Sequence, residues 1–119
     1  LVGSEMCIRD SFQAYIAASP AVALQNDWLL GYEEAFARSG RPLAARLYMT
    51  GAENEWPSFL AGIERFRQRL ASRNYQGFVF EYRLVEGERH AGTKPESYDR
   101  GMRFAFAPLA PESGRSKDR

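Results

Sequence analysis

The feature that most constrains this chain is a regular alternation between strand-like and helix-like spacing of its apolar residues. Aromatic and aliphatic side chains occupy every second position of residues 78–84, which is the period of a β-strand. Just before them, residues 57–73 place apolar side chains at every third or fourth position, with charged residues between, as an amphipathic helix does. A helix that leads directly into a strand is the repeating unit of α/β folds.

The alternation continues towards both ends of the chain. Short apolar runs at residues 13–19 and 45–50 predict two more strands. Residues 27–39 predict a helix between them, with Asn26 or Asp27 as its N-cap and Gly40 as its C-terminal stop.

A last helix is predicted to begin near Pro95, after a loop that follows the third strand. Tyr98, Met102 and Phe106 recur on it at helical spacing, so we expect them to pack in the core. The arginines of residues 64–73, in contrast, are expected to form a solvated helix face.

The order strand, helix, strand, helix, strand, helix predicts an α/β fold with three parallel strands and helices on both faces. Three strands make an incomplete sheet of the doubly wound kind. We therefore expect the first strand to pair with strands that precede residue 12 in the intact protein.

The two ends of the chain differ from the region between them. Residues 1–11 resemble a translated sequencing adaptor, so we expect them, Cys7 included, to be non-native; a frayed native N-terminus is the alternative. Residues 108–119 hold two prolines, one glycine and few apolar side chains, which predicts a disordered tail. The domain itself is predicted to span residues 12–107.

Composition argues against several classes of partner. The formal net charge is +1, and basic and acidic residues are interspersed, which disfavours nucleic-acid binding. No apolar run approaches the roughly 20 residues that cross a bilayer, so membrane insertion is not expected. A single cysteine forms no internal disulfide and offers no second thiol to a metal. Cellular location, cytoplasmic or periplasmic, stays open.

His90 is the first candidate for chemistry. It is the only histidine in the sequence and lies between glycines in the loop after the third predicted strand. Ligands bind beyond the carboxyl ends of strands in open α/β sheets, and histidine is the usual proton shuttle near neutral pH. The alternative is a solvent-exposed loop histidine without a function.

Two carboxylates, Glu53 and Glu55, directly follow the second predicted strand. A carboxylate that accepts the Nδ1 proton of a histidine sets its tautomer and stabilises the imidazolium. The alternative is that these acidic residues only favour the start of the next helix through its dipole. Trp28 and Trp56 follow the first and second strands, where they could contact a substrate; of the two, Trp28 is favoured.

Residues 12–107 resemble the C-terminal half of the siderophore-esterase-like (enterobactin-type) family of α/β-hydrolases. The Gly-Glu-x-His segment at residues 87–90 is the most specific motif. The resemblance implies that His90 is the general base of a serine carboxyl-ester hydrolase and that Glu53 is its acid, with Glu55 as the alternative. It implies no cofactor and no metal. The matching stretches are residues 12–21, 47–55, 85–92 and 97–104.

The nucleophile is the departure from the family pattern. None of the nine serines lies in Gly-x-Ser-x-Gly, the elbow that exposes the reactive hydroxyl. Ser19 has alanines at the two glycine positions, and the Pro20 that follows has no N–H to stabilise an oxyanion. We therefore expect the elbow to precede residue 12, and these residues alone to be inactive.

Two functions thus compete. The first is a C-terminal fragment of a serine esterase, whose intact form acts on a small-molecule ester. The second is a non-enzymatic α/β interaction module. Either could self-associate through the exposed edge of the first strand.

Overall fold

The computed structural model describes residues 13–107, except for the side chains of residues 13 and 24–27. The segments predicted to be non-native or disordered, residues 1–11 and 108–119, lie outside the described residues. In chain order the elements are β1 (Gln13–Ala18), α1 (Leu24–Arg38), β2 (Ala45–Ala52), α2 (Pro57–Arg73), β3 (Val79–Val85), the short 3-10 helix η1 (His90–Gly92) and α3 (Thr93–Phe106).

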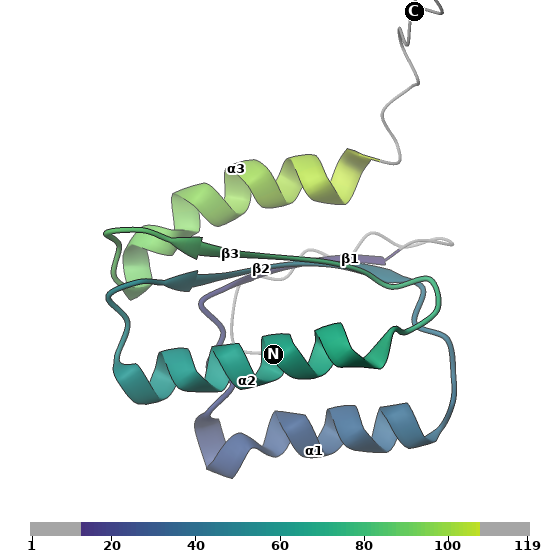
Figure 1. Ribbon diagram of the computed structural model, residues 1–119. Coiled ribbons are helices and arrows are strands. Elements are labelled where there is room, and N and C mark those ends of the chain that lie inside the picture. Colours follow the sequence, from purple (N-terminus) through teal and green to yellow (C-terminus); the bar gives the residue numbers. More distant parts are fainter. Residues whose placement is uncertain (1–12, 108–119) are drawn as a thin grey trace, which may run out of the picture.

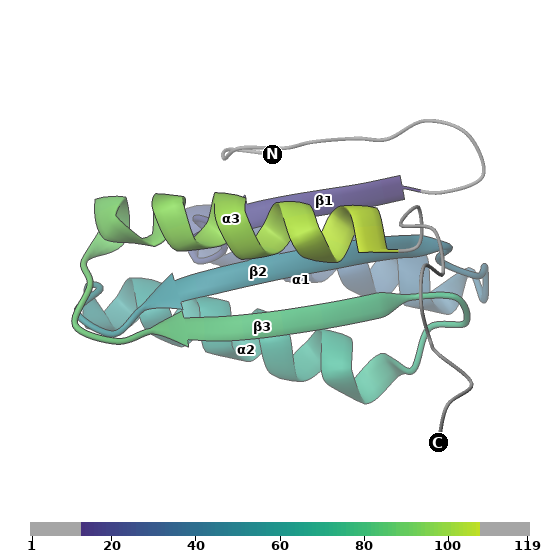
Figure 2. The same ribbon diagram turned by 90° about the horizontal axis from the view of Figure 1, so that it is seen from above.

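The three strands form one parallel sheet in the order β1-β2-β3, with β2 in the centre. Helices α1 and α2 cover one face of the sheet, and α3 lies on the other face (Figures 1 and 2). The prediction of parallel strands with helices on both faces is therefore confirmed. Because all strands run the same way, their carboxyl ends meet at one edge of the molecule.

Helix α1 departs from the predicted bounds. It begins at Leu24 rather than at Asp27, and neither Asn26 nor Asp27 is its N-cap, a position that Ala23 occupies. Val22 is buried in the core, and the turn at 22–23 leads directly into the helix. The predicted stop is confirmed, since Gly40 has a positive φ of 66°.

The core centres on β2, whose side chains reach both faces of the sheet. On one face Met49 is fully buried with Ile63 of α2 and Val22, and partly buried aromatic residues of α2 and β3 pack around them. On the other face Tyr48 is buried, and its ring lies 5.8 Å from that of Phe104 on α3. This packing fixes the strand that leads into the loop of the candidate acids.

Helix α3 turns a different face to the sheet from the one predicted. Tyr98 and Phe106 are exposed and Met102 is only partly buried, so their assignment to the core was wrong. A Cβ added at Gly101 would lie 3.0–3.1 Å from three carbons of Ile16 on β1, which shows how closely the helix approaches the sheet. The buried residues are small ones: Thr93, Ser97, Gly101 and Ala105.

The arginines of α2 include two that are not simply solvated. Arg69 and Arg73 bridge to Glu33 and Glu34 of α1, and Arg73 Nε donates to Glu33 Oε1 over 2.7 Å. Tyr75 donates to the same carboxylate, and burial together with this hydrogen bond raises the pKa of Tyr75 to about 12. These contacts tie α1 to α2 and correct the prediction of a purely solvated face.

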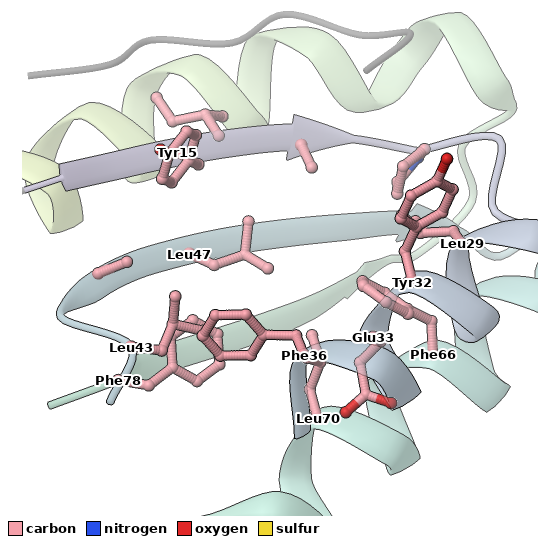
Figure 3. A pocket seen from close by; sticks show the side chains of 14 residues that line it. Tyr15, Leu29, Tyr32, Glu33, Phe36, Leu43, Leu47, Phe66, Leu70 and Phe78 are labelled. Atoms are coloured by element: carbon pink, nitrogen blue, oxygen red, sulfur yellow. The ribbon is translucent and has the colours of Figure 1, made fainter. Parts of the chain in front are cut away.

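An apolar hollow of about 510 Å³ opens between the sheet and helices α1 and α2 (Figure 3). Tyr15 and Ala17 of β1 line it together with Leu47 of β2 and Phe36 of α1. Within the described residues, β1 pairs only with β2, so its other edge has no strand beside it. The packing around β1 is therefore less complete than that around β2.

Candidate active site

The loops after β2 and β3 lie against each other at the carboxyl edge of the sheet (Figure 1). The N–H of Glu53 donates to the carbonyl of Val85 over 3.1 Å, and the N–H of Asn54 donates to that of Glu88 over 3.0 Å. These bonds continue the pairing of β2 with β3 beyond the strands. They bring the carboxylates of one loop next to the loop that carries His90.

The central contact joins the His90 ring to Glu55. His90 Nδ1 lies 3.0 Å from Glu55 Oε2, within hydrogen-bond distance. The His90 side chain is 47% exposed, whereas that of Glu55 is 1% exposed. A buried carboxylate thus faces one side of an imidazole that is open to solvent elsewhere.

Glu53, the preferred acid in the sequence analysis, has a different partner. Its Oε2 accepts the N–H of Gly87 over 2.6 Å, in the turn that follows β3. Gly87 has a positive φ of 71°, a backbone conformation that glycine adopts without steric cost. Glu53 therefore holds the turn that leads to His90, whereas Glu55 is the carboxylate that lies at the His90 ring.

The orientation of the pair defines its chemistry. A carboxylate only accepts hydrogen bonds, so Glu55 selects the tautomer with a proton on Nδ1. Nε2 then carries a lone pair and can accept a proton from a hydroxyl group. The ring of Phe59 packs edge to face on the imidazole, with 5.3 Å between the centroids. This contact limits rotation of the His90 ring away from Glu55.

A hollow of about 580 Å³ lies beside the pair. Trp56 lines it and is 69% exposed, whereas Trp28 is not part of its wall and instead packs edge to face on Tyr32, with 5.0 Å between the centroids. The preference for Trp28 over Trp56 as a contact for a ligand at His90 is therefore not supported by the geometry. The lining residues are Asn54, Glu55, Trp56, Arg89, His90 and Ala91.

Ser19 lies at the carboxyl end of β1, as expected for a strand-end residue. It is 2% exposed, and its φ of 44° lies in the left-handed region. Its hydroxyl is buried, so a substrate could not reach it.

Sequence reasoning missed three buried hydroxyl groups next to the site, those of Thr50, Thr93 and Ser97. The only available signal was that Thr93 and Ser97 lie four residues apart on the helix after His90.

Two further features concern metals and membranes. Among the described side chains, those of residues 14–23 and 28–107, no group of three or more histidine, cysteine or acidic residues is arranged to hold a metal ion. Among the helices of that same region, none has the length and apolar character that a membrane span requires.

A parallel α/β sheet with an imidazole and a carboxylate after two adjacent strands is an arrangement typical of α/β-hydrolases. No family model matches the chain. Over 107 residues, the chain is 29% identical to ferri-bacillibactin esterase BesA of Bacillus subtilis (strain 168). The aligned region covers 86% of this chain and 37% of BesA.

A solved structure is also similar. The crystal structure of BES protein from Bacillus cereus superposes on this chain with a TM-score of 0.64 and 25% sequence identity. The match covers 79% of this chain and 34% of the BES chain. The chain thus spans about a third of the length of each relative. These matches confirm the resemblance to a siderophore-esterase-like family of hydrolases, which was predicted from the sequence.

Proposed function

We propose that this chain supplies the acid and the base of a serine carboxyl-ester hydrolase, with His90 as general base and Glu55 as the acid that orients it. The observation that carries the proposal is the 3.0 Å contact between His90 Nδ1 and the buried Glu55 carboxylate. The similarity to a bacillibactin esterase supports ester hydrolysis as the reaction.

In this mechanism Nε2 of His90 takes the proton of a serine hydroxyl as that oxygen attacks the ester carbonyl. Glu55 stabilises the resulting imidazolium and itself stays ionised. The imidazolium then returns the proton to the leaving alcohol. A small-molecule ester is the proposed substrate of the intact protein, and no step requires a cofactor.

The nucleophile and the oxyanion hole are proposed to come from polypeptide outside these 119 residues. The absence of a Gly-x-Ser-x-Gly elbow from the sequence supports this, as do the buried hydroxyl of Ser19 and the apolar hollow beside β1. The 119 residues alone are therefore proposed to be inactive. They should not hydrolyse p-nitrophenyl esters, and a fluorophosphonate probe for activated serines should not label them.

The decisive experiment uses the complete product of the gene that encodes these residues. His90→Ala is expected to lower kcat/KM for ester hydrolysis by about 10⁴-fold or more, and Glu55→Gln by a comparable factor, because both act on the same proton transfer. Glu53→Gln is the matched comparison: glutamine keeps an oxygen that can accept the N–H of Gly87, so kcat/KM is expected to fall far less than in Glu55→Gln.

Three results would contradict the proposal. One is a complete gene product without a reactive serine. Another is a Glu55→Gln variant with full activity. The third is a Glu53→Gln variant that loses as much activity as His90→Ala, because Glu53 would then be the acid.

A further inference from the structure

A line of buried hydroxyl groups runs from the centre of the sheet to the backbone of His90. Thr50 Oγ1 on β2 lies 2.7 Å from Ser97 Oγ on α3. Ser97 Oγ donates to the carbonyl of Thr93 over 2.6 Å, and Thr93 Oγ1 donates to the carbonyl of His90 over 2.9 Å. All three hydroxyl residues have no solvent exposure.

The direction of this line follows from counting protons. A hydroxyl group has one proton, and that of Ser97 is used on the Thr93 carbonyl. Ser97 Oγ must therefore accept from Thr50 at their shared contact, although distance alone leaves the donor open. Thr93 uses its own proton on His90. Every donor in the line has a single acceptor, so the arrangement has one consistent set of bonds.

This order matters because η1 is short and leads directly into α3. The 3-10 helix spans only His90–Gly92, and it follows an exposed turn. Thr50, in contrast, lies in the central strand, two residues before its end, with neighbours paired on both sides. The hydroxyl line thus connects the central strand of the sheet to the residue whose ring must meet Glu55.

We infer that Thr50, Ser97 and Thr93 are positioning residues that set the place of the His90 backbone, so that its Nδ1 stays in line with Glu55. The inference rests on the proposed function, in which that contact selects the reactive tautomer. Each acts through the His90 carbonyl, directly in the case of Thr93 and through Thr93 in the case of Thr50 and Ser97. Glu53 plays the corresponding part from the opposite side by holding the turn at Gly87.

The test uses the complete gene product labelled with ¹⁵N-histidine, in which the imidazole signals of His90 are those that a His90→Gln variant lacks. The ¹⁵N chemical shifts of Nδ1 and Nε2 distinguish the two neutral tautomers. They are measured at about pH 9, where an ordinary histidine is neutral. The wild type is expected to show a protonated Nδ1 and a free Nε2.

Thr93→Val, which keeps the shape but removes the hydroxyl, is expected to lose part of the Nδ1–H population to the Nε2–H tautomer. Thr93→Ser restores the hydroxyl and is expected to restore the wild-type spectrum. Ser97→Ala deletes a single oxygen and is expected to shift the population in the same direction, so the inference stays testable if Thr93→Val does not fold. Circular dichroism verifies the fold of each variant.

Ser72→Ala is the matched control, because Ser72 Oγ donates to a carbonyl of its own helix, that of Arg69, far from His90 in the chain. Its spectrum is expected to equal that of the wild type. Folded Thr93→Val and Ser97→Ala variants with the full Nδ1–H population would overturn the positioning role alone. A wild-type spectrum with the proton on Nε2 would instead overturn the Glu55–His90 pair, and with it the proposed function.

Discussion

Substitution of Gly62 tests how α2 is packed against the segment that follows β1. A Cβ added there would lie 2.7 Å from the Cβ of Ala23 and 3.1 and 3.2 Å from its backbone N and Cα. The obstacle is backbone and a Cβ, neither of which can rotate away. The helix must therefore shift, and its neighbour Ile63 is fully buried in the core.

The expected magnitude follows from two opposing effects. Adding a methyl group to a well-packed site costs about 1–3 kcal/mol, and a fixed obstacle favours the upper part of that range. Alanine in place of glycine inside a helix contributes about 0.8–1 kcal/mol of stability. We therefore expect Gly62→Ala to lower the free energy of unfolding by about 1–2 kcal/mol, or Tm by about 4–15 °C.

Gly31 provides the control. It lies inside α1, is exposed, and has nothing within 4 Å of an added Cβ. Gly31→Ala should therefore raise the free energy of unfolding by about 0.5–1 kcal/mol. Urea unfolding followed by circular dichroism measures both variants against the wild type. A Gly62→Ala variant at least as stable as the wild type would refute the close contact between α2 and Ala23.

Further predictions concern ion pairs, the end of α2 and the free edge of β1. Burial alone would raise the pKa of Glu33, but hydrogen bonds from Arg73 and Tyr75 outweigh it, so its pKa is lowered. Its contribution to stability is then present above about pH 4.3 and lost as the pH falls through the lowered pKa. Glu33→Gln should therefore lower the free energy of unfolding by about 1–3 kcal/mol at pH 7, measured by urea unfolding. A difference between variant and wild type that is as large at low pH as at pH 7 would contradict the lowered pKa of Glu33. Asn74 ends α2 with a φ of 49°, so Asn74→Val should cost about 1–2 kcal/mol in the same assay and Asn74→Gly close to nothing. The purified chain should self-associate in sedimentation velocity, since no described strand covers the outer edge of β1; a stable monomer would argue against an exposed edge.

Much of the fold could be predicted because periodicity is a local property. The period of two in residues 78–84 and the helical spacing in residues 57–73 follow which side chains turn towards the core, since that direction is set by the geometry of each element. In β3 the alternate residues Phe80 and Tyr82 are partly buried, and only Leu84 departs from the pattern, being 40% exposed. The observed bounds of α2, Pro57–Arg73, match the prediction residue for residue. The order of the elements then led to a parallel sheet with helices on both faces.

The face of α3 could not be predicted in the same way. Large apolar residues at helical spacing, such as Tyr98 and Met102, form one stripe, and the small residues that include Ser97 and Gly101 form another beside it. Hydrophobicity favours the first stripe, but only the second lets the helix lie close to β1 and β2. The distance between helix and sheet is a tertiary property, so the sequence pattern pointed to the wrong stripe.

The sequence by itself determined that one histidine and two carboxylates follow adjacent strands, because the ends of strands can be read from local patterns. Only the tertiary structure decided that Glu55 faces His90 while Glu53 faces Gly87. The two glutamates lie two residues apart in one turn, and their directions depend on hydrogen bonds to a loop more than thirty residues away. It likewise decided that Trp56, rather than Trp28, borders the histidine, because that depends on where each helix lies on the sheet.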